Sequence, residues 1–198
     1  NVLATEGNLN NHIGVPLTLL NLNSNHEIAV VEMGANHLME INFLSNLIQP
    51  DYGYITNFGK AHLEGFGGIE GVIKGKSELY EYLRENEKTA IVNANDEKQV
   101  ELTEDIKRIC FGSNEKADYP IFFSESLSGN CPAVVYEQTH IESKLVGEYN
   151  AHNVAAAIAV GLVFEVELDD IKEAIEEYEA DNNRSQIIQL EDKKIILD

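Results

Sequence analysis

Hydrophobic residues alternate between two spacings over the first half of the chain. Short runs rich in β-branched and aromatic residues predict strands at residues 2–5, 28–31, 52–56, 89–92 and 106–111. Apolar residues at helical spacing predict helices at residues 13–20, 38–48 and 69–83, and a short acidic helix between the last two strands. The run Ile28–Val31 is continuous and apolar, so we expect this strand to be buried on both faces. The alternation is typical of an α/β fold whose mostly parallel sheet is flanked by helices.

The pattern changes from about Ala117, where turns rather than helices separate the apolar runs. A small antiparallel β appendage is therefore predicted, with strands at residues 121–124, 133–136 and 141–144. Two helices should follow at residues 153–164 and 169–178. The chain should end in a hairpin or strand pair formed by residues 187–190 and 194–197.

Composition and charge narrow the possible functions. The chain has 198 residues, 43% of them hydrophobic, which suffices for one domain or slightly more with a real core. Its 14 basic and 34 acidic residues give a net charge of −20, which excludes a chain-wide surface for nucleic acid or anionic membrane. No signal peptide is visible, and the longest apolar run, Val154–Phe164, is well short of the roughly 20 residues of a membrane-spanning helix. The two cysteines, Cys110 and Cys131, fit reduced thiols, so the expected location is cytoplasmic.

Two charged residues occupy positions that each have two explanations. Glu32 directly follows the strand Ile28–Val31, and ligands of open α/β sheets bind beyond the carboxyl ends of strands. It could hold magnesium on a nucleotide, or it could cap a helix. Lys76 lies on the apolar face of a predicted helix, where lysine is rare unless it is paired or modified. Alternatively, its ammonium reaches the edge of that face.

Three further polar residues also allow a functional and a structural explanation. His62 lies in a glycine-rich loop after a predicted strand, where a solvated side chain is the alternative to a ligand. Asn150 and Asn153 flank a helix start, where capping is a sufficient explanation. The sequence shows no zinc-type Cys and His spacing, no GxGxxG and no GxxxxGK[ST] phosphate loop, so hydride transfer and thiol chemistry have no support.

Several motifs taken together resemble one enzyme family. In chain order they are TEGNLNNHIGVPLTLL (5–20), EMGANHLMEI (32–41), ITNFGKAHLEGFGG (55–68), GKSEL (75–79), GEYNAHNVAAAIA (147–159) and NNRSQ (182–186). Their order is similar to that in the Mur ligases, and the match covers nearly the whole chain. Within the family, the resemblance is strongest to the ligases that join D-alanyl-D-alanine to UDP-N-acetylmuramoyl-tripeptide.

The resemblance implies an ATP-dependent amide ligase of peptidoglycan synthesis with a P-loop NTPase-like central fold. In this family ATP phosphorylates a carboxylate of the nucleotide-linked peptide, and the incoming amine attacks the acyl phosphate. Glu32 and His62 resemble ligands of two magnesium ions. Lys76 matches a lysine that carbon dioxide carbamylates in several members, which would turn a cation into a possible oxygen ligand for magnesium.

The resemblance also implies binding residues for the two nucleotides. Asn150 and Asn153 match a pair that borders the adenine, although Tyr149 stands where the family commonly has histidine. Arg184 matches an arginine near the phosphates, and Asp198 an acid near the ribose. Residues expected to face the nucleotide-sugar peptide are Thr5, Asn8 and Asn11.

The expected organisation is a single central ATP-binding domain over residues 1–198, taken from a longer protein. The chain starts at Asn1 without methionine, and the family's phosphate loop would lie before that residue. The C-terminal domain would follow Asp198, so this segment alone should be an incomplete catalyst. Two alternatives remain open: an amide ligase of the same superfamily that adds another amino acid, and a non-catalytic nucleotide-binding module.

Overall fold

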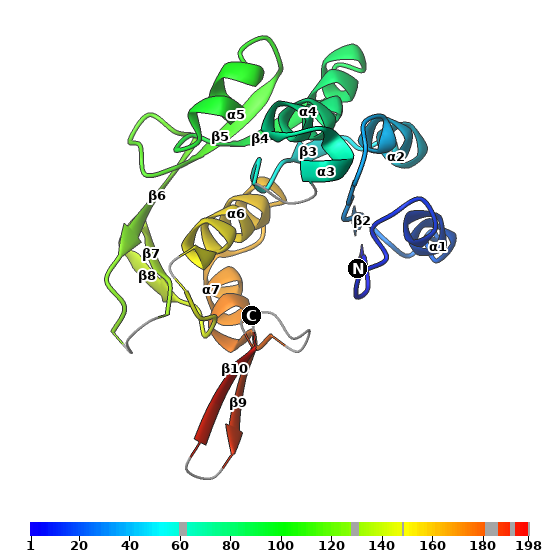
Figure 1. The fold of residues 1–198 in the computed structure, drawn as a ribbon. Helices are drawn as coiled ribbons and strands as arrows, with labels where there is room; N and C mark the ends of the chain where they lie inside the picture. The colour runs from blue at the N-terminus through cyan, green and yellow to red at the C-terminus, as the bar shows by residue number, and fades with distance from the viewer. Residues whose placement is uncertain (60–62, 128–130, 148, 181–185, 191–192, 198) are drawn as a thin grey trace. The chain divides into compact units, whose positions relative to one another are not determined.

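The chain divides into two compact units. The computed structural model describes residues 1–59, 63–127, 131–147, 149–180, 186–190 and 193–197 (Figure 1). Unit 1 comprises Asn1–Ile91 and Glu101–Arg108, and unit 2 comprises Val92–Val100 and Ile109–Asp198. The elements β4 (Thr89–Asn93), α5 (Glu97–Leu102) and β5 (Arg108–Gly112) contain the boundaries between the units.

Unit 1 has the predicted alternation of strands and helices. Its elements before β4 are β1 (Val2–Ala4), α1 (Gly14–Leu20), β2 (Ile28–Val30), α2 (Glu40–Ile48), β3 (Tyr52–Tyr54), α3 (Leu63–Phe66) and α4 (Ile69–Glu85). Strands β1 and β2 are parallel, with Val2 opposite Ile28. Strands β3 and β4 are also parallel, with Tyr52 opposite Thr89. Parallel strands joined through helices confirm the predicted α/β class for this half of the chain.

The burial predicted for Ile28–Val31 is wrong. Ile28 is half-buried, while Ala29 and Val30 are exposed, and 51% of the Val30 surface is accessible. Within the described part of the chain, β2 pairs with β1 alone and the two form a sheet of their own. A continuous apolar run needs covering layers on both faces to be buried, and the described residues of unit 1 do not supply both.

Helix α4 packs closely against its neighbours because glycines remove side chains at the contacts. A Cβ added to Gly53 of β3 would lie 2.8 Å from a methyl carbon of Leu83. A Cβ added to Gly75 of α4 would lie 2.3 Å from the ring of Phe66. Leu79 and Leu83 of α4 are buried, as is Leu44 of α2. The predicted apolar face of α4 is therefore the centre of the core of unit 1.

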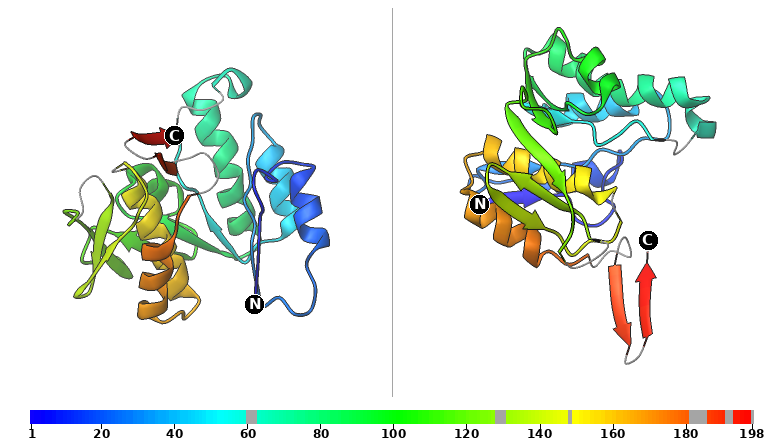
Figure 2. Two further views of the ribbon diagram at one scale, coloured as in Figure 1. Left: turned by 90° about the horizontal axis from the view of Figure 1, so that it is seen from below. Right: turned by 90° about the vertical axis from the view of Figure 1, so that its left-hand side faces the viewer.

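Unit 2 contains the antiparallel appendage predicted from the changed pattern. Its elements after β5 are β6 (Tyr119–Ser124), β7 (Ala133–Tyr136), β8 (Thr139–Glu142), α6 (Asn150–Val163), α7 (Leu168–Glu177), β9 (Gln186–Leu190) and β10 (Lys193–Leu197). Strand β6 is parallel to β5 but antiparallel to β7, and β7 is antiparallel to β8. Strands β9 and β10 form the predicted terminal hairpin, which Figure 2 shows as two adjacent arrows.

Two expectations from composition can also be compared with the structure. Cys110 and Cys131 are free cysteines, as predicted. Among the described residues, no helix is long and apolar enough to cross a membrane.

A surface ion pair between Arg84 and Asp105 joins the segment Glu101–Arg108 to α4. Arg84 donates hydrogen bonds to both carboxylate oxygens of Asp105, at 2.7 and 2.8 Å. These bonds lower the pKa of Asp105. A carboxyl group with a lowered pKa in the folded state stabilises the fold above its unfolded pKa, and this contribution is lost as pH falls through the folded pKa.

We expect Asp105→Asn to lower the urea midpoint of unfolding at neutral pH, with a difference from the wild type that disappears on acidification. Urea titrations of both proteins across the acidic range measure this difference. The neighbouring exposed Glu104 provides a matched control, because Glu104→Gln should leave the pH dependence unchanged. A difference that stays constant from neutral to strongly acidic pH would contradict this account.

Candidate functional site

Glu32 lies just beyond the carboxyl end of β2, beside the end of the parallel strand β1. The backbone N–H of Thr5 donates to the Val30 carbonyl at 3.0 Å, which extends the pairing past β1. The Glu32 backbone N–H then donates to Thr5 Oγ1 at 2.9 Å. The structure thus brings together two of the predicted site residues at the edge where ligands of α/β sheets bind.

Asn10 orients the carboxylate of Glu32. Its Nδ2 donates to Glu32 Oε1 at 2.7 Å, and its carbonyl accepts from the N–H of Gly34 at 2.7 Å. A Cβ on Gly34 would lie 3.0 Å from the Asn10 carboxamide, so glycine permits this close contact. Sequence reasoning did not single out Asn10, although it lies within the GNLNN motif that did carry the resemblance.

The other two residues expected to face the nucleotide-sugar peptide lie in the same loop but have different surroundings. The Oδ1 atom of Asn11 accepts hydrogen bonds from the N–H groups of Ile13 and Gly14, at 2.9 and 3.0 Å. Asn11 therefore caps the start of α1. Asn8 is exposed, and its carbonyl accepts from the N–H of Asn10 at 2.8 Å.

Lys76 projects from α4 toward the loop that follows β3. Its Nζ donates to the Asn57 carbonyl at 2.6 Å, and the residue is half-buried. Burial lowers the pKa of Lys76, because leaving water disfavours the charged form. The neutral amine, which is the nucleophilic form, therefore forms more readily at Lys76 than at an ordinary surface lysine.

Glu78 of the same helix is a buried carboxylate that sequence reasoning also did not single out. Its Oε1 accepts from the Met39 N–H at 2.6 Å and its Oε2 from the Asn42 N–H at 2.9 Å. Only 3% of its surface is accessible. The signal available in the sequence was its place in the GKSEL motif, three residues after Gly75.

The chemistry of these donors can be compared with the needs of magnesium. The described residues include no cluster of three or more His, Cys, Asp and Glu that could hold a metal ion. Magnesium keeps several waters and is commonly held by one or two carboxylates together with substrate phosphates. The exposed Glu32 carboxylate, oriented by Asn10, fits this limited requirement. The ammonium of Lys76 does not fit it unless the amine is converted to an anion.

In unit 2, the two asparagines expected near an adenine are bonded to each other at the start of α6. Asn153 Nδ2 donates to Asn150 Oδ1 at 2.9 Å, and Asn150 Nδ2 donates to the Val146 carbonyl at 2.9 Å. Asn150 is buried, with 5% of its surface accessible, whereas Asn153 is exposed. Asn150 thus holds the preceding loop against the helix and presents Asn153 at the surface.

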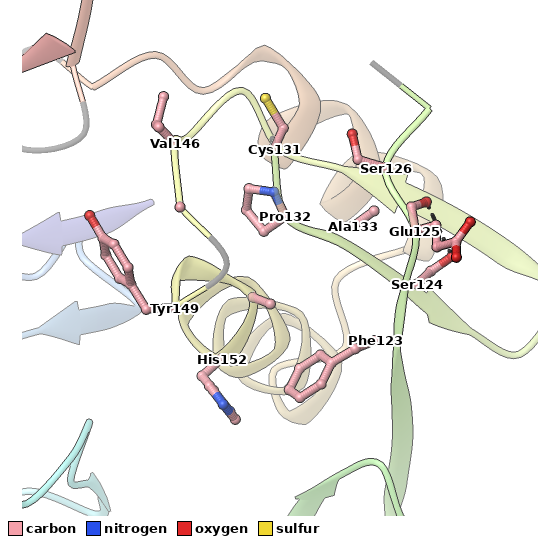
Figure 3. Close-up of a pocket in the computed structure, with 12 residues that line it drawn as sticks. Phe123, Ser124, Glu125, Ser126, Cys131, Pro132, Ala133, Val146, Tyr149 and His152 are labelled. Atoms are coloured by element: carbon pink, nitrogen blue, oxygen red, sulfur yellow. Dashed lines mark hydrogen bonds between the residues drawn. The ribbon is translucent and has the colours of Figure 1, made fainter. Parts of the chain in front are cut away.

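A pocket of about 1180 Å³ lies beside this helix start (Figure 3). The residues that line it are Phe123, Ser124, Glu125, Ser126, Cys131, Pro132, Ala133, Val146, Gly147, Tyr149, Ala151 and His152. The rings of Phe123 and His152 meet edge to face, with centroids 4.8 Å apart. His152 Nδ1 also lies 3.3 Å from Asn93 Nδ2, so the histidine is held from two sides. The lining mixes aromatic and aliphatic side chains with the polar side chains of Ser124, Glu125 and Ser126.

Three predicted site residues, His62, Arg184 and Asp198, lie outside the described residues. Glu32, Lys76 and Thr5 belong to unit 1, while Asn150 and Asn153 belong to unit 2.

The sequence and the fold of this chain match known proteins over nearly the whole chain. The family model described as "Mur ligase middle domain" matches residues 1–161. UDP-N-acetylmuramoyl-tripeptide–D-alanyl-D-alanine ligase from Haemophilus influenzae is 37% identical over 100% of this chain and 44% of its own length. The ligase of the same name from Escherichia coli is 35% identical over 100% of this chain and 45% of its own.

A solved structure, MurF from Acinetobacter baumannii, aligns with a TM-score of 0.85 and 34% identity over 99% of this chain and 44% of that one. The chain therefore spans about half the length of the relatives that it matches. These matches agree with the predicted α/β fold and with the resemblance of the motifs. On this evidence, the chain belongs to the Mur ligase middle-domain family.

Proposed function

We propose that this chain is the nucleotide-binding part of a ligase that joins D-alanyl-D-alanine to UDP-N-acetylmuramoyl-tripeptide at the expense of ATP. The observation that carries the proposal is the identity of 37% and 35% to two ligases of that name over the whole chain. The placement of Glu32 at the carboxyl end of β2 adds support. The proposed setting is cytoplasmic peptidoglycan synthesis.

The proposed chemistry has two steps, phosphorylation of the tripeptide carboxylate by ATP and attack of the dipeptide amine on the acyl phosphate. Both steps gather negative charge on phosphoryl oxygens. Magnesium, when bound, would neutralise part of that charge and orient the phosphates. Glu32 would hold one ion, with Asn10 fixing the carboxylate direction, and His62 would hold the second. Thr5, Asn8 and Asn11 lie on the loop that would face the tripeptide nucleotide.

Nucleotide binding is supported by a relative that matches nearly the whole chain, and we place the base in unit 2. MurF from Thermotoga maritima, 24% identical to this chain, was solved in complex with ADP. We assign the base to the side of the pocket formed by the start of α6, where Asn153 is exposed and Tyr149 lines the pocket. The tyrosine that replaces the family's histidine offers a ring for stacking. Arg184 and Asp198 would complete the contacts to phosphate and ribose.

Lys76 is proposed to carry a carbamate in the complete protein. The neutral amine attacks carbon dioxide, forms an N–C bond and loses one proton, which leaves a carboxylate in place of a cation. Burial favours the neutral amine that this reaction needs. The product would give the second magnesium, the one assigned to His62, an oxygen ligand from an ordered helix.

The most direct test uses the full-length ligase, meaning a protein that contains this chain and the further segments present in its relatives. With ATP and magnesium, it should release phosphate and form an amide between UDP-N-acetylmuramoyl-tripeptide and D-alanyl-D-alanine, as followed by mass spectrometry. Glu32→Ala should lower the rate at least about 100-fold, because even partners of metal ligands cost 10 to 100-fold when removed. Glu27→Ala is the matched control, with an exposed carboxylate lost at the other end of β2.

Two results would decide against this function. Exclusive use of a single amino acid as the amine would favour the alternative of another amide ligase of the superfamily. Binding of nucleotide without turnover of any amine would favour a non-catalytic module.

The carbamate has a separate prediction. In the full-length ligase, ¹³C-labelled bicarbonate should give a carbamate signal in the NMR spectrum and raise activity, and Lys76→Ala should abolish both effects. Lys74→Ala removes an exposed lysine from the same helix and should change neither. Normal activity in Lys76→Ala would show that the lysine has no such role.

A further inference from the structure

We propose that Glu78 is a positioning residue, whose carboxylate fixes the orientation of α4 so that Lys76 faces the loop after β3. This inference rests on the proposed function, because it assigns Lys76 a part in the reaction. The contacts that carry it lie entirely within unit 1.

The carboxylate of Glu78 joins α4 to the start of α2 by two strong bonds. Met39 is the N-cap residue of α2, and Asn42 lies in its first turn. The N–H groups there have no partner within their own helix, and the N-terminus of a helix attracts negative charge. Each oxygen of Glu78 accepts one of these N–H groups, at 2.6 and 2.9 Å. Charge-assisted bonds of this kind are stronger than neutral ones, and the Glu78 side of both bonds is buried.

The loop before α2, which Glu78 contacts at Met39, is also held by other hydrogen bonds. Oε2 of Glu40 accepts hydrogen bonds from the N–H groups of Asn36 and His37, at 2.7 and 3.1 Å. Gly34, earlier in the same loop, donates to the Asn10 carbonyl. The loop between Glu32 and α2 is thus tied to the Glu32 site at one end and to α4 at the other.

Lys76 and Glu78 act on different sides of α4. With 3.6 residues per turn, positions two apart point about 200° away from each other around the helix. Glu78 accordingly bonds to α2, while Lys76 bonds to the Asn57 carbonyl. Close packing at Gly53 and Gly75 sets the distance of α4 from its neighbours, whereas the hydrophobic effect itself has no direction. The two bonds of Glu78 add directional contacts that keep Lys76 facing the loop after β3.

The substitution Glu78→Gln changes the hydrogen-bonding groups of the side chain and nearly preserves its shape. Glutamine has nearly the same volume, but it offers one oxygen and one NH₂ group in place of two oxygens. One of the two backbone N–H groups would then face another donor. The exposed Glu81 on the same helix allows a matched loss of charge at the surface.

The test compares the wild type, Glu78→Gln and Glu81→Gln of the full-length ligase by competitive labelling of lysine amines, read by mass spectrometry under conditions where all three are folded. Lys74, exposed on the same helix, serves as the internal reference. The Lys76 to Lys74 labelling ratio should rise at least about threefold in Glu78→Gln, as expected when a hydrogen bond that restrains the site is lost. Glu81→Gln should leave the ratio unchanged. If Glu78→Gln does not fold, Glu78→Asp replaces it. This variant shortens the side chain by one methylene, and it should also raise the Lys76 to Lys74 labelling ratio.

The activity of the full-length ligase shows whether Glu78 positions Lys76 or only stabilises the start of α2. Glu78→Gln should lower kcat about tenfold and change KM for ATP less than twofold, because the residues assigned to the base, Tyr149 and Asn153, belong to unit 2 and not to the unit that holds Glu78. A lower stability with an unchanged labelling ratio, or an unchanged kcat, overturns the inference. If the wild-type protein proves to have no ligase activity, the proposed function fails, whereas a raised labelling ratio still supports the placement of Lys76 by Glu78.

Discussion

The close packing of α4 against its neighbours is the constraint on which unit 1 depends. Gly53 of β3 lets Leu83 approach the strand, and Gly75 of α4 admits the ring of Phe66. Such contacts fix the distance of the helix from the strand, because any side chain at these glycines would collide with the neighbour. The polar bonds of Lys76 and Glu78 can form only once this distance is set.

The candidate site residues of unit 1 lie where the chain leaves its parallel strands. Glu32 follows β2, and Asn57, whose carbonyl accepts from Lys76, follows β3. The groups that hold these residues are mostly backbone N–H and carbonyl groups in loops, joined by Asn10 and Glu78. A site built in this way keeps its carboxylate and its amine in set directions before any ligand arrives, which reduces the cost of ordering them on binding.

The sequence predicted the elements well, because periodicity and strand composition report local preference. It overestimated the burial of Ile28–Val31, since an apolar run reveals what a strand can bury but not whether a covering layer is present. It singled out Glu32 and Lys76 as candidates from their positions relative to a strand end and an apolar helix face. It could not identify Asn10 or Glu78 as their supports, because both act on groups distant in sequence, Glu32 and the start of α2. Asn11 was expected to face a substrate, and the structure adds hydrogen bonds to the start of α1 that only coordinates reveal.

We propose that the end of β2, with Glu32 oriented by Asn10, holds a metal ion on a nucleotide. Paramagnetic broadening by Mn²⁺ in the presence of ADP tests this most directly, read in the NMR spectrum of the full-length ligase. The account predicts that the backbone amide signals of Thr5, Glu32 and Gly34 broaden, and that Glu32→Ala removes the effect. Sharp signals for these amides, with broadening confined to other parts of the protein, would contradict it.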